Sequence, residues 1–250
     1  MDNHKIYGLI GYPLVHSFSR NYFNRKFEAE GIDAEYLNFE IDDIGLLMEV
    51  LSEYPQLAGL NVTIPYKEQV KPYLDEIDDD AAQIGAVNVI KIIRTDNGII
   101  TRGYNTDAIG FTTSIKPLIQ PHHRRALVLG TGGASKAVVY ALQQLLGIDV
   151  QSVSRNPAPG IITYADLDSK IMESHTVVVN ATPLGMYPHV ETHPDIPYSL
   201  LSPQHLCFDL TYNPSVTTFM RMSSEFGAKT CNGKGMLIGQ ALAAWDIWNE

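Results

Sequence analysis

Lys67 and Asp107 lie in two polar segments of this chain that could carry proton-transfer chemistry, residues 61–67 and 103–107. A lysine ammonium is protonated at neutral pH and can protonate a ketone oxygen as a hydride arrives. A nearby carboxylate would orient the ammonium and stabilise its charged form. Each residue alone could equally be a solvated surface side chain. Their positions near the end of a first predicted domain favour a catalytic pair in a reductase.

A glycine-rich turn, residues 130–135, follows the apolar run 126–129 and precedes a helical pattern. In this strand–turn–helix context, glycines bind the pyrophosphate of a dinucleotide, although a purely structural turn is the alternative. Gly130 permits the tight turn, and Gly132 lets the pyrophosphate approach the backbone. The cofactor residues expected in this turn are Gly130, Gly132, Gly133 and Ala134.

Arg155 follows the next predicted strand, and no acid stands there to hold the ribose 2′-hydroxyl of NAD. A guanidinium could instead face the 2′-phosphate of NADP and stack on adenine. The alternative is an ordinary surface arginine. The missing acid favours NADP as the cofactor.

Two further features suggest a small polar substrate. Ser17 and Ser19 begin a predicted helix, where hydroxyls and free N–H groups could hold a carboxylate, although simple N-capping explains them as well. Gln240 lies on the apolar stripe of a C-terminal helix. A buried amide needs partners, which a polyhydroxylated ligand or a backbone contact would supply.

The elements that must position these residues form two series. The first has strands at 5–11, 34–41, 57–63, 86–93 and 99–103 and helices at 17–30 and 44–54, with a hairpin at residues 95–98. The second has strands at 126–129, 150–154, 177–179 and 207–210 and helices at 106–115, 135–146 and 236–248. We therefore predict a two-domain α/β fold: an N-terminal, mostly parallel α/β substrate domain and a Rossmann-like dinucleotide-binding domain.

The composition of the chain indicates which partners and which cellular compartment to expect. The chain has 250 residues and a net charge of −10, which disfavours nucleic-acid and anionic-membrane partners. It contains no apolar run long enough to span a bilayer and no signal-peptide pattern at its start. Cys207 and Cys231 are expected to be reduced core residues, with a disulfide as the less favoured alternative. We expect a cytoplasmic protein without a metal site.

Taken together, these segments resemble the shikimate dehydrogenase family over almost the whole chain, from residue 6 to about residue 248. The matching segments occur in the family's order: 16–19, 61–67, 85–88, 105–107, 130–135, 180–186, 209–214 and 232–237. The resemblance implies an oxidoreductase that reversibly reduces 3-dehydroshikimate to shikimate with NADPH, on the route to chorismate and the aromatic amino acids.

The resemblance also implies roles for individual residues. Lys67 and Asp107 would be the catalytic pair, with Ser17 and Ser19 on the substrate carboxylate. Further contacts to the carboxylate or the ring hydroxyls would come from Thr63, Asn88, Tyr212 and Gln240.

On the cofactor side, the resemblance implies that Arg155 takes the 2′-phosphate and that Gly235 and Met236 lie near the nicotinamide. Ser154 and Thr182 complete the expected cofactor set. Ser154 replaces the asparagine usual in the family, and the loop 156–160 lacks a second basic residue. The final helix would return to the first domain, giving a substrate domain of 1–104 plus 233–250 and a cofactor domain of 105–232.

Two rival interpretations stay open at the level of sequence. One is a quinate/shikimate dehydrogenase that uses NAD. The other is a non-catalytic NADP-sensing module, which would need the glycine turn but neither Lys67, Asp107 nor Gln240. The expected partner is a small-molecule substrate. The protein is expected to be a monomer or a homodimer.

Overall fold

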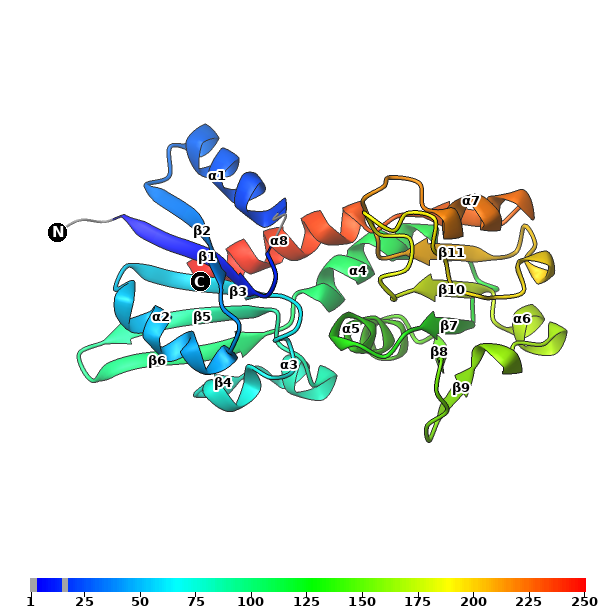
Figure 1. The fold of residues 1–250 in the computed structure, drawn as a ribbon, viewed down its shortest axis with the longest axis horizontal. Helices are drawn as coiled ribbons and strands as arrows, with labels where there is room; N and C mark the ends of the chain where they lie inside the picture. The colour runs from blue at the N-terminus through cyan, green and yellow to red at the C-terminus, as the bar shows by residue number, and fades with distance from the viewer. Residues whose placement is uncertain (1–3, 15–17) are drawn as a thin grey trace. The chain divides into compact units, whose positions relative to one another are not determined.

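The structure, a computed structural model, describes residues 4–14 and 18–250. It divides into two compact units (Figure 1): Met1–Thr106 with Ala241–Glu250, and Asp107–Gln240. The α/β fold with two units agrees with the predicted fold class. The predicted domain bounds differ in giving the whole final helix to the first domain, and they stay a prediction.

The first unit is built on a mixed sheet with the strand order β2-β1-β3-β5-β6-β4. The parallel pairing of β1 with β2 and β3 is the arrangement that the predicted β-α-β-α-β order favours. Strands β3, β5 and β6 continue the sheet antiparallel. The strands are β1 Lys5–Gly11, β2 Ala34–Glu40, β3 Leu57–Val62, β4 Glu76–Ile77, β5 Val89–Thr95 and β6 Gly98–Tyr104.

Separate helices cover the two faces of this sheet. Helices α2 (Leu47–Glu53) and α3 (Asp79–Ile84) contribute Leu47 and Ala81 to one apolar cluster. Helix α1 (Phe18–Glu30) and the last turns of α8 (Lys234–Asn249) contribute Phe23 and Trp248 to the other. The short 3-10 turns of this unit are η1 Ile44–Leu46 and η2 Lys71–Tyr73.

Trp248 explains why the C-terminal residues belong to the first unit. Its indole Nε1 donates to the carbonyl oxygen of Ile90 in β5 at 3.0 Å. Gly59 in β3 has no side chain where the indole ring lies, and a β-carbon there would collide with the ring. The end of the chain is therefore locked into the sheet's core by one hydrogen bond and by close packing.

The second unit has an all-parallel sheet with the strand order β12-β11-β10-β7-β8-β9, of which Figure 1 labels β11 to β9. This is the doubly wound order of dinucleotide-binding domains, so the predicted Rossmann-like architecture is confirmed. The strands are β7 Arg125–Leu129, β8 Asp149–Ser154, β9 Ile161–Thr163, β10 Val177–Asn180, β11 Leu206–Asp209 and β12 Lys229–Cys231.

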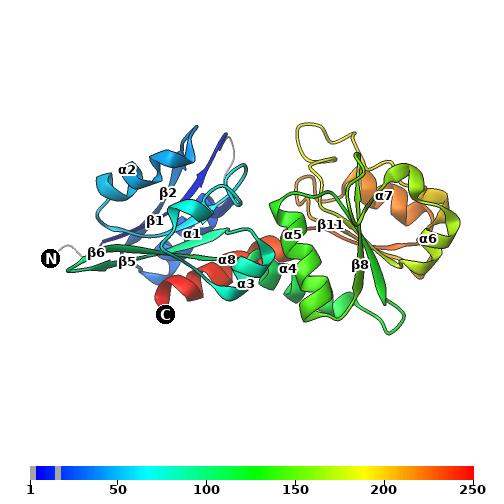
Figure 2. The same ribbon diagram turned by 90° about the horizontal axis from the view of Figure 1, so that it is seen from below.

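The helices of the second unit pack around this sheet, and α4 packs against α5 (Figures 1 and 2). The predicted helix 135–146 is α-helical only to Tyr140 and continues as a π-helical segment, Ala141–Leu145. The other elements are α4 Asp107–Ile115, α5 Gly133–Tyr140, α6 Ser169–Ser174, α7 Thr218–Glu225, η3 Lys116–Leu118, η5 Tyr164–Asp166 and η6 Tyr198–Leu200.

Cys207 in β11 is buried in the core, as predicted, whereas Cys231 in β12 is only half-buried, so the core prediction is wrong for Cys231; both cysteines are free. Within residues 4–14 and 18–250, no helix combines the length and apolar character needed to cross a membrane.

Candidate functional site

The segment that carries Lys67 is held by backbone hydrogen bonds on both sides. Thr63 directly follows β3, and its N–H donates to the carbonyl of Ile10 at 2.9 Å. The carbonyl of Lys67 accepts from the N–H of Val87 at 2.7 Å. Between them, the buried Tyr66 donates its hydroxyl to the carbonyl of Ile41 at 2.7 Å. These bonds fix the backbone from which the partly buried Lys67 side chain projects.

Asn88 is buried directly before β5, and its side chain is held by hydrogen bonds. Its Oδ1 accepts from the N–H of Thr106 at 2.7 Å, and its Nδ2 donates to the Thr106 hydroxyl at 3.0 Å. The Asn88 carbonyl accepts from Val62 at the end of β3. The end of β3 and the chain beyond β6 are thus joined at this asparagine.

Tyr36, which the sequence analysis did not single out, links two predicted site residues of the first unit. Its hydroxyl donates to Asn61 Oδ1 at 2.7 Å and also hydrogen-bonds with Ser19. Asn61 Nδ2 in turn donates to the Asn88 carbonyl at 3.4 Å. Burial raises the pKa of Tyr36 well above its ordinary value, partly offset by Ser19. Ser17, the other predicted carboxylate ligand, lies outside the described residues.

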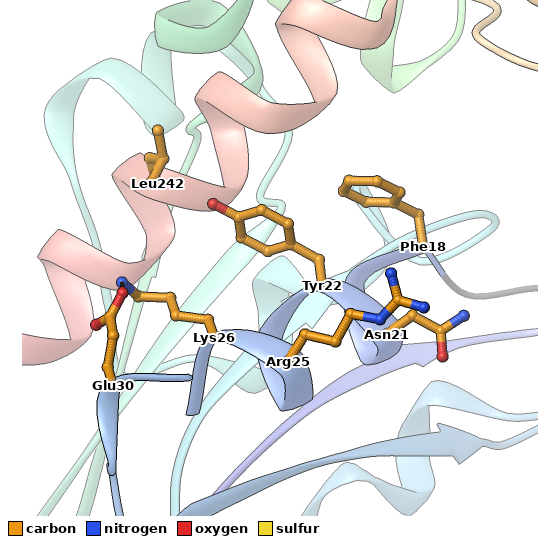
Figure 3. Close-up of a pocket in the computed structure, with 7 residues that line it drawn as sticks. All are labelled: Phe18, Asn21, Tyr22, Arg25, Lys26, Glu30 and Leu242. Atoms are coloured by element: carbon orange, nitrogen blue, oxygen red, sulfur yellow. Dashed lines mark hydrogen bonds and ion pairs between the residues drawn. The ribbon is translucent and has the colours of Figure 1, made fainter. Parts of the chain in front are cut away.

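A groove of about 620 Å³ opens between α1 and the C-terminal part of α8. Figure 3 shows Tyr22 pointing from α1 towards α8, and Lys26 meeting Glu30, with an Nζ–Oε1 distance of 2.6 Å. No predicted site residue lines this groove, so we do not assign the substrate to it. Its lining residues are Phe18, Asn21, Tyr22, Arg25, Lys26, Glu30 and Leu242.

The glycine turn of the second unit is tight at one glycine and open at another. Gly130 has φ +105°, and a β-carbon on it would lie 3.1 Å from the Ala181 carbonyl oxygen. Ser135 donates its hydroxyl to the Gly130 carbonyl at 2.6 Å. A β-carbon on Gly132 would meet no atom of the described residues within 4 Å, and this glycine precedes α5 without a side-chain cap. Such a helix start offers free N–H groups to an anion, which fits a pyrophosphate.

Ser154 and Arg155 lie at the same carboxyl edge of the sheet, at the end of β8. Strand β8 pairs with β7 up to Leu129, which directly precedes the glycine turn. Arg155 is exposed and close enough to Tyr164 to offset part of the rise in the pKa of that phenol caused by burial. The position suits a guanidinium that reads a phosphate beside the turn.

Thr182 lies in the loop after β10, next to the glycine turn. Its methyl carbon would be 3.2 Å from a β-carbon on Gly130. Its hydroxyl donates to Asn180 Oδ1 at 2.6 Å. The predicted cofactor residues Gly130 and Thr182 are therefore neighbours at the junction of β7 and β10, where the strand order reverses and ligands bind in doubly wound folds.

The remaining predicted residues lie after β11 and in α4 and α8. Tyr212 is 38% exposed, whereas Gln240 is buried and donates Nε2 to the Leu237 carbonyl of its own helix at 3.0 Å. Gly235 and Met236 lie in the first turn of α8. Asp107 is the buried first residue of α4, where a carboxylate suits the helix dipole.

The structure thus brings predicted residues together within each unit. Ser19, Thr63, Lys67 and Asn88 belong to the first unit. The second unit contains the predicted cofactor residues and also the predicted substrate residues Tyr212 and Gln240. Lys67 and Asp107 belong to different units, so their pairing stays a prediction. In the described part of the chain, no cluster of His, Cys, Asp and Glu side chains could hold a metal ion.

Comparison with known proteins gives consistent matches. Residues 9–90 match the family model described as shikimate dehydrogenase substrate binding domain. The NADP(+) shikimate dehydrogenase of Methanococcus maripaludis strain C6 is 36% identical over 98% of this chain and 91% of its own length.

Solved structures agree in fold. A shikimate dehydrogenase crystallised with NADP+ is 32% identical, with a TM-score of 0.85 over 98% of this chain and 90% of that one. A quinate dehydrogenase from Corynebacterium glutamicum in complex with NAD is 29% identical, with a TM-score of 0.83 over 98% of this chain and 93% of that one. The fold alone therefore does not separate these two activities.

Proposed function

This chain belongs to the shikimate dehydrogenase family, and we propose that it catalyses the reversible NADPH-dependent reduction of 3-dehydroshikimate to shikimate. It would act as an oxidoreductase on a CH–OH group, on the route to chorismate and the aromatic amino acids. The observation that carries the proposal is the match to NADP-dependent relatives over nearly the whole chain.

Bound NADPH supplies the hydride that reduces the substrate carbonyl. Lys67 donates a proton to the carbonyl oxygen, so the ketone becomes an alcohol, and solvent then reprotonates the lysine. Asp107 holds the ammonium in its charged form and in the correct orientation. In the reverse direction the neutral lysine accepts the hydroxyl proton. The anchored backbone around Lys67 supports this role because a general acid must be held at a fixed position.

Most of the proposed substrate contacts come from the first unit. Ser17 and Ser19 would hold the carboxylate. Thr63 and Asn88 of the same unit, with Tyr212 and Gln240 of the second, would contact the carboxylate or the ring hydroxyls. The hydrogen-bonded connection from Ser19 through Tyr36 and Asn61 to the Asn88 backbone supports a preorganised site. The proposed substrate domain is 1–104 plus 233–250, and the cofactor domain is 105–232.

The second unit is proposed to bind NADP. Gly130, Gly132, Gly133 and Ala134 would hold the pyrophosphate, and Arg155, after Ser154, would pair with the 2′-phosphate. Gly235 and Met236 would lie near the nicotinamide, and Thr182 is a further proposed cofactor residue. The open space at Gly132 and the uncapped start of α5 support this assignment.

We place the enzyme in the cytoplasm, since two free cysteines favour a reducing compartment. A monomer and a homodimer are both compatible with the proposal, because its residues all come from one chain.

The proposal is tested by measuring kcat/KM for shikimate and for quinate, each with NADP+ and with NAD+. We expect the highest value for shikimate with NADP+, because Arg155 has no neighbouring acid to bind the ribose of NAD. A highest value for quinate with NAD+ would identify the rival dehydrogenase. NADPH binding without turnover of either substrate would identify the non-catalytic module.

A further inference from the structure

Asp209 is a buried carboxylate at the carboxyl edge of the second sheet. It ends β11, is 0% exposed and pairs in register with Asn180, which ends β10. Its Oδ1 accepts from Asn180 Nδ2 at 3.1 Å and from the N–H of Thr211 at 2.9 Å. One carboxylate oxygen thus receives donors that belong to two neighbouring strand ends.

Asn180 extends this connection to the loop beside the glycine turn. Its Oδ1 accepts from both the N–H and the hydroxyl of Thr182, at 3.1 and 2.6 Å. Its Nδ2 also donates to the Leu184 carbonyl at 3.3 Å. Since Thr182 packs beside Gly130, the side chain of Asn180 joins Asp209 to the predicted pyrophosphate site.

Thr211 extends the connection in the other direction, to the start of α8. Its carbonyl accepts from the N–H of Gly233 at 3.1 Å. Gly233 packs so closely on Leu210 that a β-carbon would collide with the Leu210 carbonyl. Asp209 is therefore linked through Thr211 to the residues that directly precede Gly235 and Met236.

The second carboxylate oxygen of Asp209, Oδ2, accepts a hydrogen bond from the residue that caps helix α7. Thr217 donates its hydroxyl to Oδ2 at 2.6 Å and accepts from the N–H of Met220 at 3.2 Å, as the N-cap of α7. Asp209 therefore has one branch towards the two loops and a separate branch towards α7. The branch towards α7 can be removed on its own by mutating Thr217, whereas removing the Asp209 side chain removes both branches.

We propose that Asp209 is a positioning residue for the dinucleotide site, and that its Oδ1 holds the loops after β10 and β11 in place before the cofactor binds. This inference rests on the proposed function only in naming NADPH as the ligand. Loops fixed in advance lose less conformational entropy on binding, so they bind the ligand more tightly. Burial of this carboxylate is costly and raises the pKa of Asp209, and the hydrogen bonds from Thr217, Thr211 and Asn180 offset part of that cost.

The test is the dissociation constant of NADPH for the full chain, followed by NADPH fluorescence well below the unfolding temperature. Asp209→Ala removes the acceptor shared by both loops and should weaken NADPH binding by about tenfold, because loops that are not fixed in advance must be ordered when the cofactor binds. Asp209→Asn keeps one oxygen for Asn180 and Thr211, while its amide can donate to Thr217. It should bind NADPH within about threefold of wild type.

Thr217→Val is the matched control, because it removes the branch towards α7 and leaves Oδ1 untouched. We expect it to lower the unfolding temperature while leaving the NADPH dissociation constant at the wild-type value. Wild-type affinity in Asp209→Ala, or equal weakening by Asp209→Ala and Thr217→Val, would overturn the positioning role. Failure of the wild-type chain to bind NADPH would instead refute the proposed function.

A measurement on the wild-type protein covers the case in which Asp209→Ala does not fold. Amide hydrogen exchange of Thr182 and Thr211 should be slow before NADPH is added, because their N–H groups donate to Asn180 and Asp209. Fast exchange at both amides that becomes slow only with NADPH would show that the cofactor, not Asp209, orders these loops.

Discussion

Gly110 of α4 lies directly against the backbone of Gln240 in α8. A β-carbon on Gly110 would come within 2.7 Å of the Gln240 nitrogen and 2.5 Å of the Met236 carbonyl oxygen. Gly239 is its counterpart, since a β-carbon there would lie 3.0 Å from the Gly110 α-carbon. Two glycines therefore allow the helices to approach closely at the turn that carries Gln240 and, one turn earlier, Met236. Both are proposed ligand residues.

Replacing Gly110 with alanine should therefore disturb both stability and ligand binding. The new methyl group must push α8 away from α4, and overpacking of this kind costs roughly 1–3 kcal/mol. Urea unfolding should show this loss, and the KM for shikimate should rise. Thr113→Ala, on an exposed position of α4, is the control and should do neither. An unchanged unfolding midpoint for Gly110→Ala would mean that the contact is not as tight as described.

Replacing Lys67 with alanine should lower kcat by roughly 10²–10⁴, the contribution expected of a general acid–base group. The dissociation constant of NADPH should change little, because Lys67 belongs to the first unit and the glycine turn to the second. Steady-state kinetics with a separate binding titration would measure both. Lys170→Ala, at an exposed position of α6, serves as the control. Unimpaired turnover in Lys67→Ala would remove its catalytic assignment.

Replacing Arg155 with alanine should weaken NADP+ binding much more than NAD+ binding, because only NADP+ carries the 2′-phosphate that a guanidinium pairs with. The ratio of kcat/KM for the two cofactors measures the effect independently of enzyme concentration. Arg125→Ala is a suitable control, since Arg125 is exposed at the opposite, amino end of β7. Equal losses with both cofactors in Arg155→Ala would show that the arginine does not read the phosphate.

The stability of the protein should fall as the pH drops below about 6.5, through the buried His123. Burial lowers the pKa of this imidazole, and its Nδ1 accepts from the N–H of Gln120 at 2.9 Å. Below the unfolded-state pKa, the unfolded chain therefore binds a proton that the folded chain does not, which favours unfolding.

Urea midpoints at a series of pH values would test this. The decline should be shallower in His123→Gln than in wild type, since glutamine does not titrate. Parallel pH profiles for the two proteins would assign the decline to other groups.

Most of the regular structure could be predicted because its patterns are local. Strands β1, β3 and β7 are apolar runs bounded by turn residues. The bounds of β1 are as predicted, and those of β3 and β7 differ by one residue at one end. The hairpin was also predicted, although Thr95 pairs with Gly98, so the turn is centred one residue earlier than the Asn-Gly pair suggested. Strands β4, β9 and β12 were missed because two or three residues are too few to show a period.

Two missed helices had readable signals. Asp168 and Thr217 each accept a hydrogen bond from the first turn of α6 and α7, as N-caps do. These caps were available in the sequence and could have located the helices.

The polar side chains that organise the site were harder to foresee. In the sequence, Tyr36 cannot be told from an ordinary strand residue. Its role in connecting site residues depends on hydrogen bonds with Asn61 and Ser19, which lie far away in sequence. Asp209 could be recognised as part of a family segment, but its donor Asn180 lies 29 residues away in sequence, at the end of another strand. Partners of this kind are set by tertiary packing, which periodicity does not reveal.

The most direct test of the proposed activity is to incubate the purified chain with shikimate and NADP+ and to quantify both products, NADPH by absorbance and the organic acid by chromatography. The proposed reaction predicts that NADPH and 3-dehydroshikimate form in equal amounts and that both are consumed when the reaction is run in reverse. Absence of both products, with a chain that is folded and binds NADPH, would contradict the dehydrogenase assignment.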